Sequence, residues 1–218
     1  MILSQLASPG ASVLYADAIS VADPRYLSSA PGAAEMGLIN AAGAQMAQYY
    51  EIPIYATSGM TDAKVPDVQS GYEKALSSLA VALSGGNYIH DAVGVLGFGT
   101  TVSYEQYVID DEINGMILRI VKGIEVNEDT LAVDLIKNVG PGGVFCNLKH
   151  TVNHLRSELF FPKVSDRLPT RDEWLAKGGK DARERARDIA REILRSHRPT
   201  PIPTDVEKQI RESIPNIV

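Results

Sequence analysis

The sequence predicts an α/β protein whose parallel βα units make about half of a TIM-type (βα) barrel, followed by a helical carboxyl-terminal tail. A strand, a loop and an amphipathic helix follow one another three times, with strand starts near residues 12, 53 and 87. Such alternation is typical of parallel sheets. The loops after the strands are long and polar, whereas the connections from helix to next strand are short. This asymmetry indicates a ligand site at the carboxyl ends of the strands.

Each repeat has a short apolar or alternating stretch followed by a pattern of helical period. The predicted strands are 11–18, 52–58 and 87–96. The predicted helices are 33–51, 67–86 and 102–124.

The pattern changes after residue 124, where helices prevail. We expect a helix over 127–140 with Asn127 as its N-cap and Gly140 as its stop, then a fourth short strand around Val144–Asn147. The remaining helices are predicted at 150–160, 171–197 with a break near Gly178 and Gly179, and 205–214. The domain division that follows is a partial βα barrel over 1–148 and a helical extension over 149–218.

Composition narrows the class of protein. The chain has 218 residues, 44% apolar and 22% charged, with a net charge of −6, and the acidic residues concentrate before residue 140. An acidic body argues against nucleic-acid binding, which requires cations to neutralise phosphates. The single cysteine, Cys146, excludes an internal disulfide framework and fits a reducing cytoplasm. No signal peptide or membrane-spanning stretch is predicted, so we expect a cytoplasmic protein without membrane contacts.

Three or four strands cannot close a barrel, which takes about eight strands and about 250 residues. A partial sheet would expose two edges and part of its core. We therefore expect the chain to associate, either with itself or with a missing amino-terminal barrel half.

Four stretches carry a resemblance to a known family. They are TSGMTDAKVPDVQSGYEKALSSLAVALSGGNYIHDAVGVL (57–96), SYEQYVIDDEINGM (103–116), GIEVNEDTLAVDLIKNVGPGGVF (123–145) and HTVNHLRSELFFPKVSDR (150–167). Together they resemble the carboxyl half of the trimethylamine methyltransferase family, which includes glycine betaine methyltransferases. The resemblance implies a βα barrel that moves a methyl group from a methylated amine to the cobalt of a separate corrinoid protein. Two departures stand out: family members are about twice as long, and this sequence contains no pyrrolysine, which makes a quaternary amine or betaine the expected substrate.

This chemistry requires a pocket for a methylated cation, which aromatic faces provide. Tyr15, Tyr55 and Tyr88 each fall within a predicted strand. They are candidate substrate-binding residues, with packing in the core or at the rim as the alternative for each.

His90 is the candidate catalytic residue. Alternation along the third strand places Tyr88, His90 and Ala92 on one face and Asn87, Ile89 and Asp91 on the other. A histidine that faces a barrel lumen could donate a hydrogen bond to a substrate carboxylate. The alternative is a core histidine whose hydrogen bonds are satisfied.

The loop after the second strand, YATSGMTDAKVPD (55–67), is rich in polar side chains. Four of its residues are further candidates for substrate binding: Ser58, Gly59, Thr61 and Asp62. Gly59 can adopt a positive φ or allow a ligand to approach the backbone. Asp67 is also a plausible N-cap of the next helix, so part of the loop can serve helix initiation.

Cys146, His150 and His154 are spaced as on one helical face, a spacing that can bind zinc. The glycines at 140, 142 and 143 argue against a helix that reaches back to Cys146, and no fourth ligand is evident. We therefore predict no bound metal and no directly bound cofactor; the cobalt corrinoid would be carried by a partner protein.

Two functions remain open at this point. The first is a methyltransferase subunit or fragment that acts on a methylated, expected quaternary, amine together with a corrinoid protein. The second is a non-catalytic half barrel that serves as an assembly or scaffold protein. The first requires other polypeptide to complete the barrel, and the presence of a neighbouring reading frame for that half would separate the two.

Overall fold

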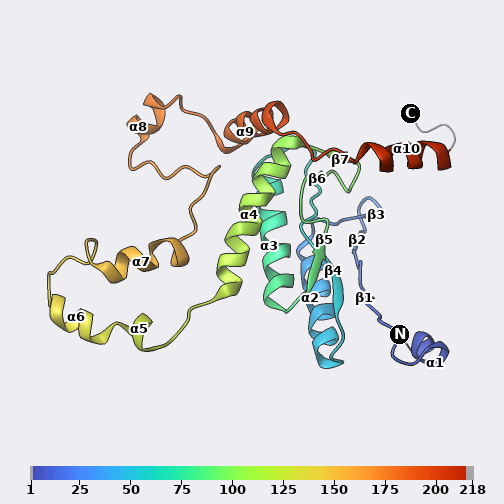
Figure 1. Ribbon diagram of the computed structural model, residues 1–218, viewed down its shortest axis with the longest axis horizontal. Helices are drawn as coiled ribbons and strands as arrows, with labels where there is room; N and C mark the ends of the chain where they lie inside the picture. The colour runs from blue at the N-terminus through green and yellow to red at the C-terminus, as the bar shows by residue number, and fades with distance from the viewer. Residues whose placement is uncertain (1, 215–218) are drawn as a thin grey trace.

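The computed structural model describes residues 2–214, which form a mixed α/β protein with small sheets and long helices (Figure 1). The strands are β1 (Tyr15–Ala16), β2 (Ala22–Asp23), β3 (Ser28–Ser29), β4 (Ile54–Thr57), β5 (Tyr88–His90), β6 (Val95–Leu96) and β7 (Thr101–Val102). The helices are α1 (Ile2–Ala7), α2 (Ala34–Tyr49), α3 (Val68–Leu83), α4 (Tyr104–Lys122), α5 (Glu128–Leu131), α6 (Val133–Val139), α7 (Lys149–Glu158), α8 (Arg171–Ala176), α9 (Ala182–Ser196) and α10 (Thr204–Ser213).

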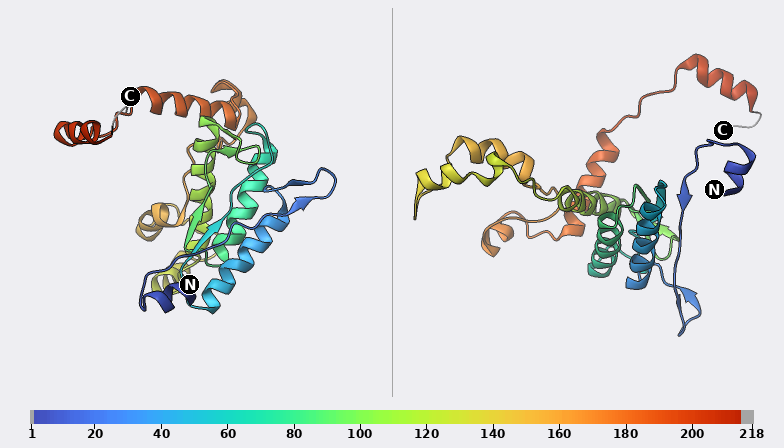
Figure 2. Two further views of the ribbon diagram at one scale, coloured as in Figure 1. Left: turned by 90° about the vertical axis from the view of Figure 1, so that its right-hand side faces the viewer. Right: turned by 90° about the horizontal axis from the view of Figure 1, so that it is seen from below.

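The central sheet is parallel, with strand order β1-β4-β5. Helices α2, α3 and α4 stand side by side, and in Figure 2 they lie together on one side of the strands. Ile54 and Ala56 of β4 are fully buried in a core that also contains Ala47 and Val81 of the helices. Period-two alternation therefore sends the other side chains of the strands to the face that these helices leave free.

Local signals explain where the helices of this layer begin. The side chain of Asp67 accepts from the backbone N–H of Ser70, and the Ser70 hydroxyl accepts from Asp67 N–H, which is a capping box. Ser103 caps α4 with its hydroxyl, which accepts from the backbone N–H of Gln106. The prediction that Asp67 is an N-cap is confirmed.

The α2–α3 contact depends on small residues. A Cβ added at Gly37 of α2 would lie 3.1 Å from the Cα of Ser77 in α3, so the two helices can approach this closely because a hydrogen replaces the side chain.

The strands are shorter than predicted, and the third ends early. The predicted strand 87–96 stops at His90, because Asp91 adopts a left-handed backbone with φ of 60°. The second part of that stretch is β6, which pairs antiparallel with β7 in a separate hairpin. Residues 2–214 contain no closed barrel: β1 and β5 are the outer strands of the three-stranded sheet.

After α4 the prediction of helices holds better than that of strands. The fourth strand expected around Val144–Asn147 is wrong, since turns and irregular backbone occupy this stretch. The single helix expected over 127–140 is divided into α5 and α6 at Ala132, whose φ is 48°. The N-cap at Asn127, the stop at Gly140 and the break at Gly178 and Gly179 are confirmed.

A second layer lies on the outer side of α4. The carboxylate of Glu112 accepts hydrogen bonds from the backbone N–H groups of Lys163, Val164 and Ser165 at 2.5 to 2.6 Å, and one from the Ser165 hydroxyl. Helix α9 then packs on α4 through Ala186, which is fully buried. This arrangement fixes the chain after α7 to the central layer.

Helices α5, α6 and α7 project away from this body in Figure 1, and none of them contains a buried residue. Across residues 2–214, every helix is too short or too polar to cross a lipid bilayer.

Candidate functional site

Three aromatic rings stack on the face of the sheet that α2, α3 and α4 do not cover. The Tyr55 ring lies 4.9 Å from the Tyr88 ring and 4.3 Å from the His90 ring between centroids, with interplanar angles of 24° and 6°. Tyr55 and Tyr88 are directly opposite each other in the parallel ladder, and His90 follows two residues later on the same face. We call Tyr55, Tyr88 and His90 the aromatic face.

Tyr15 does not belong to the aromatic face. It is in register with Ile54, whose side chain points into the helix-covered core, so alternation directs Tyr15 away from Tyr55. The structure thus brings together two of the three tyrosines that the sequence analysis selected.

His90 is held by polar groups on both ring nitrogens. Its Nδ1 lies 3.1 Å from the carbonyl oxygen of Ala56, and its Nε2 lies 3.1 Å from a carboxylate oxygen of Asp91. The hydroxyl of Thr57 lies 3.4 Å from the ring. These contacts fix the orientation of the imidazole, while a partly exposed side chain leaves its edge accessible.

Thr57 connects His90 to the first strand, because its hydroxyl donates to the carbonyl oxygen of Asp17 at 2.9 Å. The Asp17 side chain is 5% exposed, and within the described residues its two carboxylate oxygens accept no hydrogen bond. Burial raises the pKa of Asp17, an effect that its own backbone N–H and, to a smaller extent, the nearby His90 partly offset. Sequence reasoning missed both residues, because Thr57 and Asp17 look like ordinary strand-end residues.

The polar loop after β4 turns out to be held mainly by α3. The Thr61 hydroxyl donates to Glu73 at 2.5 Å, and the Ser58 hydroxyl donates to that of Ser78 at 3.2 Å. Both loop side chains are buried. Their hydroxyls therefore position the loop.

Gly59 is the point of closest approach in this loop. Its φ is 72°, and an added Cβ would lie 2.7 Å from the Cα of Ala92 in the loop after β5. The positive φ that the sequence analysis allowed here is confirmed, and the close neighbour is Ala92 of the chain itself.

Asp62 links the loop to the one that follows β1. Its carboxylate accepts from the backbone N–H of Gly32 at 3.0 Å. Burial and the neighbouring Glu73 raise the pKa of Asp62, while the Gly32 hydrogen bond and Lys64 oppose them. On the other side, the Gly97 N–H donates to the Ala63 carbonyl at 2.8 Å. The loops after β1, β4 and β5 thus form one connected rim.

A buried ion pair lies beneath this rim. Lys74 of α3 and Asp110 of α4 are each 1% exposed and lie 2.9 Å apart. Lys74 also donates to the carbonyl oxygen of Gly59 at 2.5 Å, and Asp110 accepts from the backbone N–H of Gly94 at 2.7 Å. The pair therefore anchors the loops after β4 and β5 at the same time. The sequence carried little signal for it, since a lysine in an amphipathic helix usually faces solvent.

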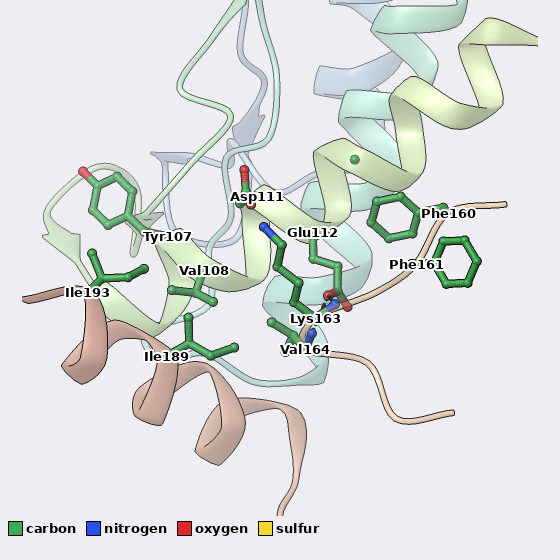
Figure 3. Close-up of a pocket in the computed structure, with 11 residues that line it drawn as sticks. Tyr107, Val108, Asp111, Glu112, Phe160, Phe161, Lys163, Val164, Ile189 and Ile193 are labelled. Atoms are coloured by element: carbon green, nitrogen blue, oxygen red, sulfur yellow. Dashed lines mark hydrogen bonds between the residues drawn. The ribbon is translucent and has the colours of Figure 1, made fainter. Parts of the chain in front are cut away.

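An apolar hollow lies in a different place. A cavity of about 370 Å³ lies between α4, the segment 160–164 and α9, with Phe160, Phe161 and Ile189 among its walls (Figure 3). It is on the outer side of α4 and shares no lining residue with the aromatic face, so the two are separate features.

The sheet is parallel, with helices on one face, aromatic rings on the other and polar loops at the carboxyl ends of its strands. These features are typical of the class of α/β proteins that bind ligands at strand ends. The family model described as "Trimethylamine methyltransferase (MTTB)" matches residues 1–216. The chain belongs to this trimethylamine methyltransferase family, which confirms the resemblance seen in the sequence.

Curated relatives agree with this assignment. The chain is 40% identical over 214 residues to "Trimethylamine methyltransferase MttB" of Desulfitobacterium hafniense (strain DSM 10664 / DCB-2), covering 98% of this chain and 42% of the relative. It is 41% identical over 211 residues to the protein of the same name from Methanosarcina barkeri (strain Fusaro / DSM 804), covering 97% and 42%. "Glycine betaine methyltransferase" of Desulfitobacterium hafniense (strain Y51) is 34% identical over 212 residues, with coverage of 97% and 44%. The chain thus spans less than half the length of these relatives.

Proposed function

We propose that this chain supplies part of the active site of a methyltransferase that transfers a methyl group from a quaternary amine to the cobalt of a corrinoid carried by a partner protein. The aromatic face carries this proposal, together with membership of the family. Stacked rings on an uncovered sheet face suit a methylated ammonium group, which is attracted by about 0.5 to 2 kcal/mol to an aromatic ring. One relative is named for glycine betaine, which is a quaternary amine, and the others are named for trimethylamine, a tertiary amine; both names support a methylated amine as the substrate.

The chemistry places modest demands on the protein. Attack by a cobalt(I) co-substrate on one methyl carbon breaks the C–N bond, and the nitrogen keeps the electron pair. A quaternary amine leaves as a neutral tertiary amine, so no proton is supplied. The protein's task is to position one methyl carbon in line with the acceptor.

Within this chain, Tyr55 and Tyr88 would hold the cation. His90, whose two ring nitrogens already face the Ala56 carbonyl and the Asp91 carboxylate, would complete the aromatic wall that orients the substrate. Gly59 and Asp62 would shape the adjacent rim, with Ser58 and Thr61 keeping it in place from below. Tyr15, directed to the other side of the sheet, would lie outside the pocket.

The barrel itself is part of the proposal. The three parallel strands with helices on one face would be a sector of a βα barrel, completed by the remaining length that the relatives possess or by another copy of the chain. The second candidate, a non-catalytic half barrel that acts in assembly, is favoured by one observation: in residues 2–214 the sheet ends at β1 and β5 without further strands.

The test is formation of methyl-cobalt(III), followed by absorbance, with a panel of methylamines and betaines and a corrinoid protein. The chain would be assayed alone and together with the segment that the relatives have in addition. We expect turnover of a quaternary amine in the complemented sample. A stable homodimer that forms no methyl-cobalt in either sample would favour the assembly function.

Variants of the aromatic face sharpen this test. Tyr88→Leu and His90→Ala should raise the quaternary amine concentration needed for half-maximal rate by about 3- to 30-fold, the equivalent of 0.5 to 2 kcal/mol. Tyr49→Leu, an exposed tyrosine on α2, is the matched control and should leave the rate unchanged. Equal kinetics for all three variants and the parent chain would remove the aromatic face from the mechanism.

A further inference from the structure

A cluster of metal-ligating side chains lies far from the aromatic face, between α5 and α7. His150 and His154 are one turn apart on α7, and Asp129 is in α5. The Nε2 of His154 lies 2.8 Å from Oδ2 of Asp129, and the Nε2 of His150 lies 3.6 Å from Oδ1. One ligand atom from each of the three residues falls within 4.8 Å of the other two.

The direction of these side chains is as informative as their distance. The two imidazole rings lie 4.4 Å apart between centroids, and both present Nε2 to the same carboxylate. Asp129 sits in the first turn of α5, where Asn127 and Thr130 form a capping box that fixes the turn. In the described part of the chain, the ion-pair partners of Asp129 are these two histidines. The Nε2 of His150 also lies 2.8 Å from the backbone carbonyl oxygen of Asp129, so two imidazole nitrogens and one carboxylate meet beside the first turn of α5.

We propose that Asp129, His150 and His154 bind a divalent metal ion of the Zn²⁺ class and thereby join α5 to α7. Two imidazole nitrogens and a carboxylate oxygen are ligands for Zn²⁺ and its neighbours Co²⁺, Ni²⁺ and Cu²⁺. Ca²⁺ and Mg²⁺ prefer sets made of oxygen. A water molecule would complete the tetrahedral coordination.

The fold explains what such an ion would do. Helices α5, α6 and α7 contain no buried residue, and α5 and α6 have only 4 and 7 residues. Helices this short are marginal in water without tertiary contacts. A metal ion that connects residue 129 to residues 150 and 154 would close the intervening loop and replace the missing apolar core.

Cys146 does not belong to the cluster. It lies before the first residue of α7, which begins at Lys149, and its side chain is exposed. Asp129, remote in sequence, takes the place that the sequence spacing gave to Cys146. The nearby thiol nevertheless provides a useful control, because a cysteine ligand changes the absorption spectrum of bound Co²⁺.

The experiment is titration of the full chain, stripped with a chelator, with Zn²⁺ by calorimetry and with Co²⁺ by absorbance. We expect one equivalent to bind, with ligand-field bands of a nitrogen and oxygen site. His154→Ala and Asp129→Asn should each weaken binding at least about 100-fold, because even partners outside the coordination sphere contribute 10- to 100-fold. His197→Ala and Asp134→Asn, at exposed positions outside the cluster, should bind like the parent chain.

A second measurement follows the structural role. Zn²⁺ should slow trypsin cleavage after Lys137, an exposed residue inside the loop that the metal would close, and His154→Ala should abolish this protection. Cys146→Ser should change neither binding nor protection. Metal binding that survives in His154→Ala and Asp129→Asn, or that is lost in Cys146→Ser, would overturn the assignment.

Discussion

Replacing Lys74 by methionine is the most direct test of how the candidate site is held together. Methionine keeps much of the lysine volume but removes the charge and the donors. It leaves the Asp110 carboxylate buried at 1% exposure and takes the hydrogen bond from the Gly59 carbonyl. Removal of one partner from a buried pair costs about 3 to 5 kcal/mol, because the other charge stays behind uncompensated.

The remaining contacts of Asp110 moderate but do not cancel this cost. Gln106 and the Gly94 N–H still donate to its carboxylate at 2.7 Å each. Burial raises the pKa of Asp110, and the charge and hydrogen bond of Lys74 oppose that rise. Without Lys74 the pKa of Asp110 rises further, because burial then acts with less opposition.

Urea unfolding followed by circular dichroism measures the difference. We expect Lys74→Met to lose about 3 to 5 kcal/mol, or roughly 6 to 20 °C in midpoint temperature for a chain of this size. Lys64→Met is the matched control. Lys64 is exposed in the loop that contains Gly59, and it donates to the Asp62 carbonyl, so its replacement should change the free energy of unfolding by no more than about 0.5 kcal/mol. Equal unfolding of the two variants would refute the claim that the buried pair anchors the rim.

Three further predictions concern other contacts. Glu112→Gln should lower the free energy of unfolding by about 2 to 3 kcal/mol. Burial opposes ionisation of Glu112, but the hydrogen bonds from the segment 163–165 outweigh burial and lower its pKa. The parent chain should therefore lose this stability as pH falls below the usual glutamate value and through the lowered pKa, and urea titrations of the variant should show no such loss. Gly59→Ala should lower the free energy of unfolding by at least about 2 kcal/mol, because residue 59 has a positive φ and an added Cβ would meet Ala92. Gly71→Ala on α3, where an added Cβ meets open space, should raise the free energy of unfolding by up to about 1 kcal/mol. Equal urea midpoints for the two variants would contradict this. Burial raises the pKa of Asp17, so the parent chain should lose stability as pH rises from the usual aspartate value through that pKa, and Asp17→Asn should lack this loss; urea titrations that give parallel pH profiles for the two chains would exclude this.

The parts of the fold that depend on periodicity were predictable. The apolar period of 3.6 residues located α2, α3 and α4, and alternation correctly separated Ile89, which packs against the core, from Tyr88 and His90. The N-cap at Asp67 was also predictable, because the residues that form it are neighbours in the sequence. The ends of the strands were less predictable. Asp91 adopts a left-handed backbone conformation, which aspartate tolerates, but the presence of an aspartate does not predict that conformation.

The parts of the site that depend on partners remote in sequence could not be derived. The hydroxyls of Ser58 and Thr61 suit a ligand or a helix equally well, and only the positions of Ser78 and Glu73 show which use the fold makes of them. Asp129 stands in a helix-start pattern, and nothing near it in sequence points to two histidines more than 20 residues further on.

The buried pair also bears on the proposed cation site. Lys74 and Asp110 neutralise each other, so the anchor adds little net charge beneath the loops. Their hydrogen bonds instead fix the backbone at Gly59, two residues after β4, and at Gly94, directly before β6. A pocket that binds a quaternary ammonium group needs rigid aromatic walls rather than a strong opposing charge, because the methyl groups keep a carboxylate from close approach. A neutral, buried anchor below an aromatic face meets that requirement, and a loosened anchor should therefore weaken cation binding even though it touches no substrate.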